Sequence, residues 1–273
     1  MRIELVKRKE QSRLMLVLSP LIAVGLTALA AGLIFLISGH NPLIALYKFF
    51  IEPLTQQWSL EATIDKATPL ILIGCGLAVC YLSNNWNIGA EGQFIVGALF
   101  GSFLPVLYPD FESAATLPLM LVFGALGGAL WALIPALLKT RFNTNEILTS
   151  LMLVYVASLI LDYLVRGPWR DPKGFNFPTT AAFDPNATVP LLFDGSRVHL
   201  GCILTLIVVA VAAVTLGRTI KGFEIRVVGA APRAARFAGF NANQLVIFTF
   251  MISGALAGLA GILEVAGPVG HLQ

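Results

Sequence analysis

The chain has 273 residues, of which 57% are hydrophobic and 12% are charged, and its mean hydropathy is +0.81. Soluble domains carry about 25% charged residues, so this composition excludes an ordinary soluble domain and predicts a polytopic, all-α membrane protein. The net charge is only +3, and no Lys/Arg tract with interleaved aromatic residues occurs, so we expect no nucleic-acid partner.

The predicted spans are read from long apolar runs. In chain order they cover residues 14–38, 67–82, 88–107, 117–138, 147–165, 199–216 and 244–265. The first run follows a basic segment and is too long for a signal-peptide core, so it predicts a retained anchor with a cytoplasmic N-terminus. The second run is short for a membrane crossing of about 20 residues. Residues 40–66 are mixed and fit either a short interfacial helix on the outer face or a loop.

The basic residues support this topology. Segments expected inside hold twelve of the 18 Lys and Arg residues, and segments expected outside hold six. Cytoplasmic loops of membrane proteins carry such an excess. The longest outer segment, residues 166–198, contains five prolines and predicts an irregular loop. At residues 143–146, Asn-Thr-Asn-Glu is typical of a helix start.

Helix packing is indicated by small residues at a spacing of four. The pairs are Gly97/Gly101, Gly124/Gly128 and Gly254/Gly258. Such pairs let membrane helices approach closely. We therefore expect a tightly packed bundle that forms a single membrane domain, residues 1–273.

A polar stretch, residues 83–93, interrupts the apolar chain between the second and third spans. It contains Asn84, Asn85, Asn87, Glu91 and Gln93. Polar side chains at membrane depth face the protein interior or a wet cavity, and two glycines interrupt the helical pattern. The stretch predicts a discontinuous helix whose five polar residues line a translocation pathway. The alternatives are a short cytoplasmic turn and, for Glu91, a purely structural bond to free backbone N–H groups.

A second polar segment, residues 217–243, contains an alanine-rich run that starts at Pro232. Proline suits a first helical turn, and Gly239 is a typical helix stop. The segment predicts a short cytoplasmic helix bearing Arg233, Arg236 and Phe237. It would dock into a groove of another protein or lie on the membrane surface.

No motif indicates catalysis. The three cysteines lie in or beside apolar runs, the three histidines are isolated, and no phosphate-binding loop occurs. We expect no catalytic residue, no metal, no cofactor and no disulfide framework.

Four motifs resemble the permease subunits of bacterial ABC importers of the simple-sugar and nucleoside type. They are Asn-Asn-Trp-Asn-Ile-Gly-Ala-Glu-Gly-Gln (84–93), Asn-Glu-Ile-Leu (145–148), Gly-Pro-Trp-Arg-Asp-Pro (167–172) and residues 229–240. The resemblance implies inward conduction of a nucleoside or sugar across the bacterial inner membrane. It implies four kinds of partner: an ATPase subunit, a second related permease, an external substrate-binding lipoprotein and the lipid membrane.

The same resemblance implies that residues 217–243 form the segment that couples the permease to the ATPase. Its coupling residues would be Glu224, Pro232, Arg233, Arg236 and Phe237. Two features depart from the family pattern: Val154 replaces an expected asparagine, and the family continues beyond the last residues with further spans. A C-terminally incomplete permease domain is therefore expected. An ion-coupled secondary transporter and a non-transporting membrane scaffold or fragment are the alternatives.

Overall fold

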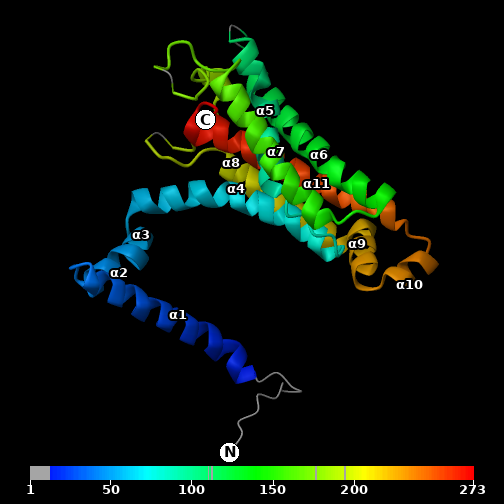
Figure 1. Ribbon diagram of the computed structural model, residues 1–273, viewed down its shortest axis with the longest axis horizontal. Helices are drawn as coiled ribbons and strands as arrows, with labels where there is room; N and C mark the ends of the chain where they lie inside the picture. Colours follow the sequence, from blue (N-terminus) through cyan, green and yellow to red (C-terminus); the bar gives the residue numbers. More distant parts are fainter. Residues whose placement is uncertain (1–12, 110, 112, 176, 194) are drawn as a thin grey trace, which may run out of the picture. The chain divides into compact units, whose positions relative to one another are not determined.

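The computed structural model describes residues 13–109, 111, 113–175, 177–193 and 195–273. Apart from one isolated bridge between Leu191 and His199, these residues form helices and the segments that connect them (Figure 1). Backbone contacts divide the chain into two compact units, one up to Leu60 and one from Glu61 onward. The basic residues that precede Arg13 in the predicted topology lie outside the described residues.

The first unit contains α1 (Arg13–Ile37), α2 (Pro42–Phe50) and α3 (Glu52–Thr55). α2 begins where it does because the Asn41 side chain accepts a hydrogen bond from the backbone N–H of Leu43 and a proline opens the helix. This region is therefore helical rather than a loop. Its place at the membrane interface stays a prediction.

The second unit is a helical bundle. It contains most of α4 (Gln57–Leu82), then α5 (Ala90–Leu107), α6 (Thr116–Phe142), α7 (Glu146–Arg166), α8 (Gly201–Arg218), α9 (Ile220–Ala230), α10 (Pro232–Phe237) and α11 (Ala242–Glu264). A single π-helical turn, Val265–Val269, continues α11, and a 3-10 turn, Pro185–Ala187, lies in the proline-rich loop. In the described chain, seven helices are long and apolar enough to cross a membrane, which confirms the predicted polytopic fold.

Two predictions about the second span were wrong. α4 has 26 residues rather than 16, because polar residues before Ala67 find partners elsewhere in the second unit: Lys66 pairs with Glu264, and the Glu61 carboxylate accepts from the backbone N–H of Arg197. The polar stretch is also not a break inside one helix. It is a connection, residues 83–89, between two separate spanning helices. We call these residues the 83–89 connection.

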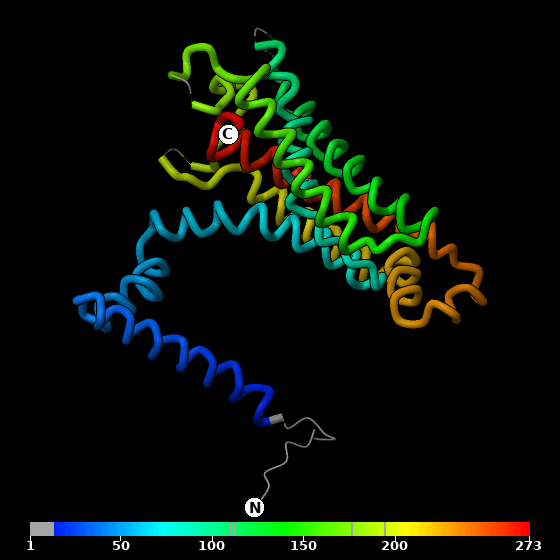
Figure 2. Tube along the Cα trace, viewed as in Figure 1, coloured from blue at the N-terminus to red at the C-terminus, as the bar shows by residue number. Residues whose placement is uncertain are grey.

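The connections define two ends of the bundle. The C-terminal ends of α4, α6 and α8 and the N-terminal ends of α5, α7 and α11 lie at the end that carries α9 and α10. We call it the α9–α10 end. The proline-rich loop and the last described residues lie at the opposite end, as the tube trace shows (Figure 2). That loop is largely irregular, as predicted.

The core of the bundle forms where α5, α6 and α11 pack against one another. A Cβ atom on Gly97 would lie 2.1 Å from the Cα of Gly258, and one on Gly128 would lie 2.1 Å from the carbonyl oxygen of Gly254. Only glycine permits backbones this close. The close approach predicted from the glycine pairs is therefore confirmed.

Candidate functional site

Burial alternates along the 83–89 connection. Its buried residues are Ser83, Asn85, Asn87 and Gly89, and its exposed residues are Asn84, Trp86 and Ile88. Alternation with a period of two is the mark of an extended chain. From residue 85 onward the connection therefore turns Asn85 and Asn87 into the bundle and Trp86 and Ile88 outward.

Asn84 ends α4. Its φ of 56° is left-handed, its backbone N–H donates to the carbonyl of Tyr81, and the N–H of Asn85 donates to the carbonyl of Cys80. These two bonds form the Schellman motif, which satisfies the last carbonyls of a helix, and asparagine tolerates the required conformation. Asn84 thus has a structural role, and its exposed side chain remains available for contacts.

Asn87 and Gln93 form a buried, reciprocal amide pair. The Asn87 Nδ2 group donates to Gln93 Oε1 at 2.9 Å, and Gln93 Nε2 donates to Asn87 Oδ1 at 3.0 Å. Asn87 also donates to Ser253 Oγ on α11 at 3.0 Å and accepts from the backbone N–H of Gly89 at 3.1 Å. The pair joins the connection, the start of α5 and the middle of α11.

Asn85 is held by a charged pair. The Lys139 ammonium, near the end of α6, donates to Asn85 Oδ1 at 2.8 Å and to Glu146 Oε1, in the first turn of α7, at 2.5 Å. Asn85 Nδ2 donates to Ser83 Oγ at 2.7 Å. Sequence reasoning missed Lys139 because it was counted only as an inner-loop charge. The available signal was that Lys139 precedes Glu146 of the Asn-Glu motif by seven residues.

The five predicted pathway residues therefore do not form one surface. Three of them, Asn85, Asn87 and Gln93, are buried and bonded inside the chain, whereas Asn84 and Glu91 are exposed. Glu91 lies in the first turn of α5. Their role in translocation stays a prediction.

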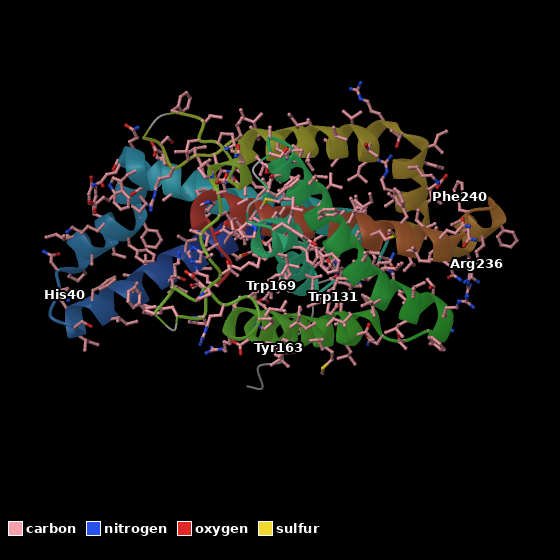
Figure 3. All side chains as sticks on the ribbon, turned by 90° about the horizontal axis from the view of Figure 1, so that it is seen from above. His40, Trp131, Tyr163, Trp169, Arg236 and Phe240 are labelled. Atoms are coloured by element: carbon pink, nitrogen blue, oxygen red, sulfur yellow. The ribbon has the colours of Figure 1, made fainter. Side chains whose placement is uncertain are left out.

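The predicted coupling residues lie on α9 and α10. Arg233, Arg236 and Phe237 are exposed, Phe237 at 95%, and Pro232 opens α10. Glu224 is half-buried and pairs with Lys221 at 2.7 Å. Arg236 lies with Phe240 at one end of the bundle, away from Trp131 and Trp169 (Figure 3). The geometry presents a small cationic and aromatic surface.

This segment is packed firmly onto the bundle. Ile225 and Val228 of α9 and Ala235 of α10 are buried in a cluster with Val79 of α4 and Leu245 of α11. A Cβ atom on Gly229 would lie 2.0 Å from the carbonyl oxygen of Leu82. α9 therefore touches α4 directly where the 83–89 connection begins.

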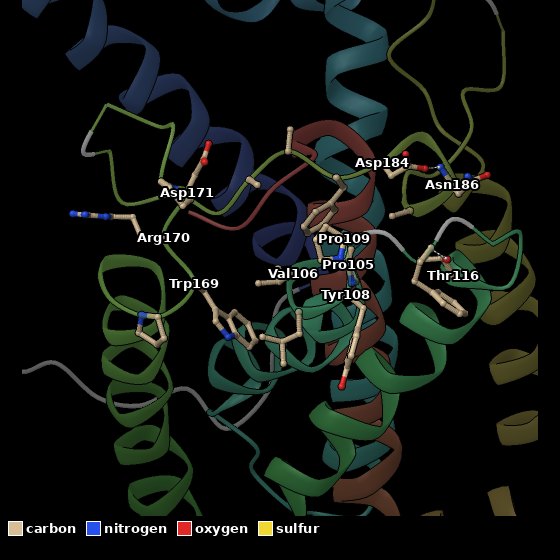
Figure 4. Close-up of a pocket in the computed structure, with 18 residues that line it drawn as sticks. Pro105, Val106, Tyr108, Pro109, Thr116, Trp169, Arg170, Asp171, Asp184 and Asn186 are labelled. Carbon is tan, nitrogen blue, oxygen red and sulfur yellow. Dashed lines mark hydrogen bonds between the residues drawn. The ribbon is translucent and has the colours of Figure 1, made fainter.

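A pocket of about 490 Å³ opens at the opposite end of the bundle, between the ends of α5 and α6 and the proline-rich loop (Figure 4). Trp169, Arg170 and Asp171 line it from the motif at 167–172, and Tyr108 lines it from the end of α5. Aromatic and charged groups together suit contact with a polar partner.

A second polar cluster lies at that end. The Nε2 atom of buried His199 is 3.3 Å from Asp65 Oδ1, and its Nδ1 atom accepts from the backbone N–H of Gly201. Burial lowers the pKa of His199, although Asp65 and Glu264 oppose this shift. Among the described residues, no group of three or more His, Cys, Asp or Glu side chains is placed to hold a metal ion.

The chain matches a known protein family over most of its length. Residues 59–271 match the profile of the permease component of branched-chain amino acid transport systems. The chain belongs to this permease family. The match covers the whole second unit up to its third-last residue, and therefore includes the 83–89 connection, α9 and α10.

The relatives of this permease include three ABC transporter permeases. The glucose permease TsgB13 of Haloferax volcanii is 38% identical to this chain, and the match covers 93% of this chain and 69% of TsgB13. The guanosine permease NupP of Bacillus subtilis is 32% identical, and the match covers 93% of this chain and 73% of NupP. The nucleoside permease NupB of Lactococcus lactis is 30% identical, and the match covers 90% of this chain and 70% of NupB. No solved structure matches.

These relatives confirm the resemblance to ABC importer permeases of the simple-sugar and nucleoside type. They favour that class over the ion-coupled carrier and the scaffold. Permeases of this kind work with an ATPase and a substrate-binding protein. The chain is a multi-pass membrane protein and a transport subunit.

Proposed function

We propose that this permease conducts a nucleoside or a simple sugar inward, driven by ATP hydrolysis on a separate subunit. The cargo class is supported by relatives named for glucose, guanosine and nucleosides. The chain would sit in the bacterial inner membrane with its N-terminus and α9–α10 end in the cytoplasm, as its basic residues predict. A second related permease and an external binding lipoprotein would complete the importer.

The observation that carries this proposal is the exposed α10 surface. Phe237 is 95% exposed, with Arg233 and Arg236 beside it on a helix whose Ala235 is anchored in the core. Aromatic and arginine side chains are enriched at protein–protein interfaces. Residues 217–243 thus fit a coupling segment that receives motion from the ATPase.

The pocket at the opposite end suits the external binding protein. It lies on the other side of the bundle from α10, and its lining combines Trp169 and Tyr108 with charged loop residues. Alternating access would open the pathway to each end in turn. Of the five predicted pathway residues, the exposed Asn84 and Glu91 would face the pathway, and the buried Asn85, Asn87 and Gln93 would support its wall.

The test compares two equally exposed phenylalanines. Purified from membranes that also contain the ATPase subunit, the Phe237→Ala variant should no longer capture that subunit. Phe175 is also 95% exposed but lies in the proline-rich loop, so the Phe175→Ala variant should still capture it. Arg233→Glu with Arg236→Glu should reduce ATP-dependent uptake while leaving the protein in the membrane. Wild-type capture and uptake in these variants would refute α10 as the coupling surface.

The cargo is tested separately. Uptake into proteoliposomes that hold the complete importer would be measured with radiolabelled guanosine, uridine, glucose and ribose. We expect ATP-dependent uptake of one of the two classes, with competition inside that class only. Absence of uptake for all four compounds would refute the proposed cargo.

A further inference from the structure

The 83–89 connection is contacted by other elements of the bundle at two separate points. α9 lies against its start, where Gly229 meets the carbonyl of Leu82. The corner between α6 and α7 holds it near its middle, where Lys139 bonds Asn85. A movement of α9 would therefore push on a segment that is tied elsewhere.

The corner between α6 and α7 is short and well defined. Asn143 ends α6 in a left-handed conformation with a φ of 52°, and the Asn145 side chain caps α7 by accepting from the N–H groups of Ile147 and Leu148. Glu146 follows directly. The corner is thus fixed by its own caps and offers a firm anchor for Lys139.

Lys139 links this anchor to the connection. Its ammonium bridges Glu146 Oε1 and Asn85 Oδ1, and the exposed fractions of the Lys139 and Glu146 side chains are only 25% and 14%. Asn85 itself is 3% exposed. Losing the ammonium would leave a largely buried carboxylate and a buried amide oxygen without this donor, and such groups are costly.

We propose that Lys139 is a positioning residue that clamps the 83–89 connection to the corner between α6 and α7. Displacement of the connection by α9 requires this bridge to open, so Lys139 sets the free energy at which the connection moves. Its part in transport rests on the proposed function. The clamp itself is a property of this chain alone.

A native cysteine reports on the clamp. Cys80 is fully buried beside α6 and α11, and its thiol donates to the carbonyl of Thr249. Its own carbonyl accepts from the backbone N–H groups of Ser83 and Asn85, so exposure of the thiol requires the junction between α4 and the connection to open. Replacing Cys75 and Cys202 by alanine leaves Cys80 as the sole thiol. The rate of N-ethylmaleimide labelling of the purified chain then measures opening of the connection.

In that background, Lys139→Met should raise the Cys80 labelling rate by about tenfold, the low end for loss of a charged hydrogen bond. Lys139→Arg should restore slow labelling because it keeps the charge and the donor. Arg141→Met, which removes an exposed charge from the same end of α6, should change nothing. Glu146→Gln provides a second, milder opening if Lys139→Met does not fold. Slow labelling in every folded variant would overturn the clamp.

Transport gives an independent readout. In the reconstituted importer, Lys139→Met should lower the amount of cargo taken up per ATP hydrolysed, and Lys139→Arg should restore it. If Lys139→Met labels quickly at Cys80 but takes up as much cargo per ATP hydrolysed as the wild type, the role of the clamp in coupling is refuted. Absence of ATP-driven uptake in the wild-type importer would refute the proposed function, whereas the labelling result would still decide the clamp.

Discussion

The buried amide pair allows a double-mutant cycle that separates a structural role from a pathway role. Gln93→Met removes both hydrogen bonds to Asn87 while keeping a long side chain. Asn87 then retains Ser253 and Gly89 as partners. Two neutral hydrogen bonds at about 1 kcal/mol each predict a loss of about 2 kcal/mol in the free energy of unfolding.

Asn87→Leu should cost more, because it also leaves Ser253 and the Gly89 N–H without their partner. The double variant should lose about 2 kcal/mol less than the sum of the single losses, since the shared bonds are removed only once. Unfolding of the purified chain in mixed detergent micelles, titrated with dodecyl sulfate, measures all three values. Strict additivity would refute a shared amide pair.

Uptake by the same variants completes the experiment. If Gln93 acts only in the fold, uptake per folded molecule of Gln93→Met stays at the wild-type value once membrane levels are matched. If Gln93 also contacts cargo, uptake per folded molecule falls. We expect the first result, because both polar atoms of the Gln93 amide are already bonded to Asn87.

Three further predictions test other parts of the chain. Gly258→Ala should destabilise the chain by about 3 kcal/mol in the same unfolding assay, because its Cβ would lie 2.2 Å from the carbonyl oxygen of Gly124; Gly74→Ala, with open space around it, should be near neutral, and equal costs would contradict the packing argument. Because burial lowers the pKa of His199, its neutral form stabilises the folded chain above its ordinary pKa of 6.5, and this stabilisation is lost as the pH falls below that value. The thermal unfolding temperature should therefore fall between about pH 7.5 and 5.5, and it should fall less in His199→Asn. The same pH dependence in both proteins would contradict a buried, neutral histidine. Glu91→Gln should leave thermal stability unchanged and reduce uptake, since Glu91 is exposed beside the connection; normal uptake kinetics would remove it from the pathway.

The sequence predicted the helical fold well because apolar runs and glycine spacing are local signals. It misjudged α4, since the polar residues of its first turns suggested a loop. Glu61 accepts from the backbone N–H of Arg197, 136 residues later, and Lys66 pairs with Glu264, 198 residues later. Pairing over such a separation leaves no mark in local composition.

The polar stretch of the candidate site stands out in the sequence, but its contacts do not. Three asparagines within four residues look alike in sequence, yet Asn84 caps a helix, Asn85 meets a lysine and Asn87 pairs with a glutamine. Which role each residue takes depends on the alternation of the extended chain and on α6 and α11. Only the tertiary structure places those partners.

The hydrogen-bonding capacity of Asn87 narrows where a pathway can run. A side-chain amide offers two donors on nitrogen and two acceptor sites on oxygen. Asn87 donates to Gln93 and Ser253 and accepts from Gln93 and Gly89, so all four positions are used. Cargo could bind Asn87 only by breaking a buried bond. The exposed row of the connection and the first turn of α5, with Glu91, carry no such cost, which favours a pathway along that face. A pathway on an exposed face needs a second wall, and the second permease of the proposed importer would supply it.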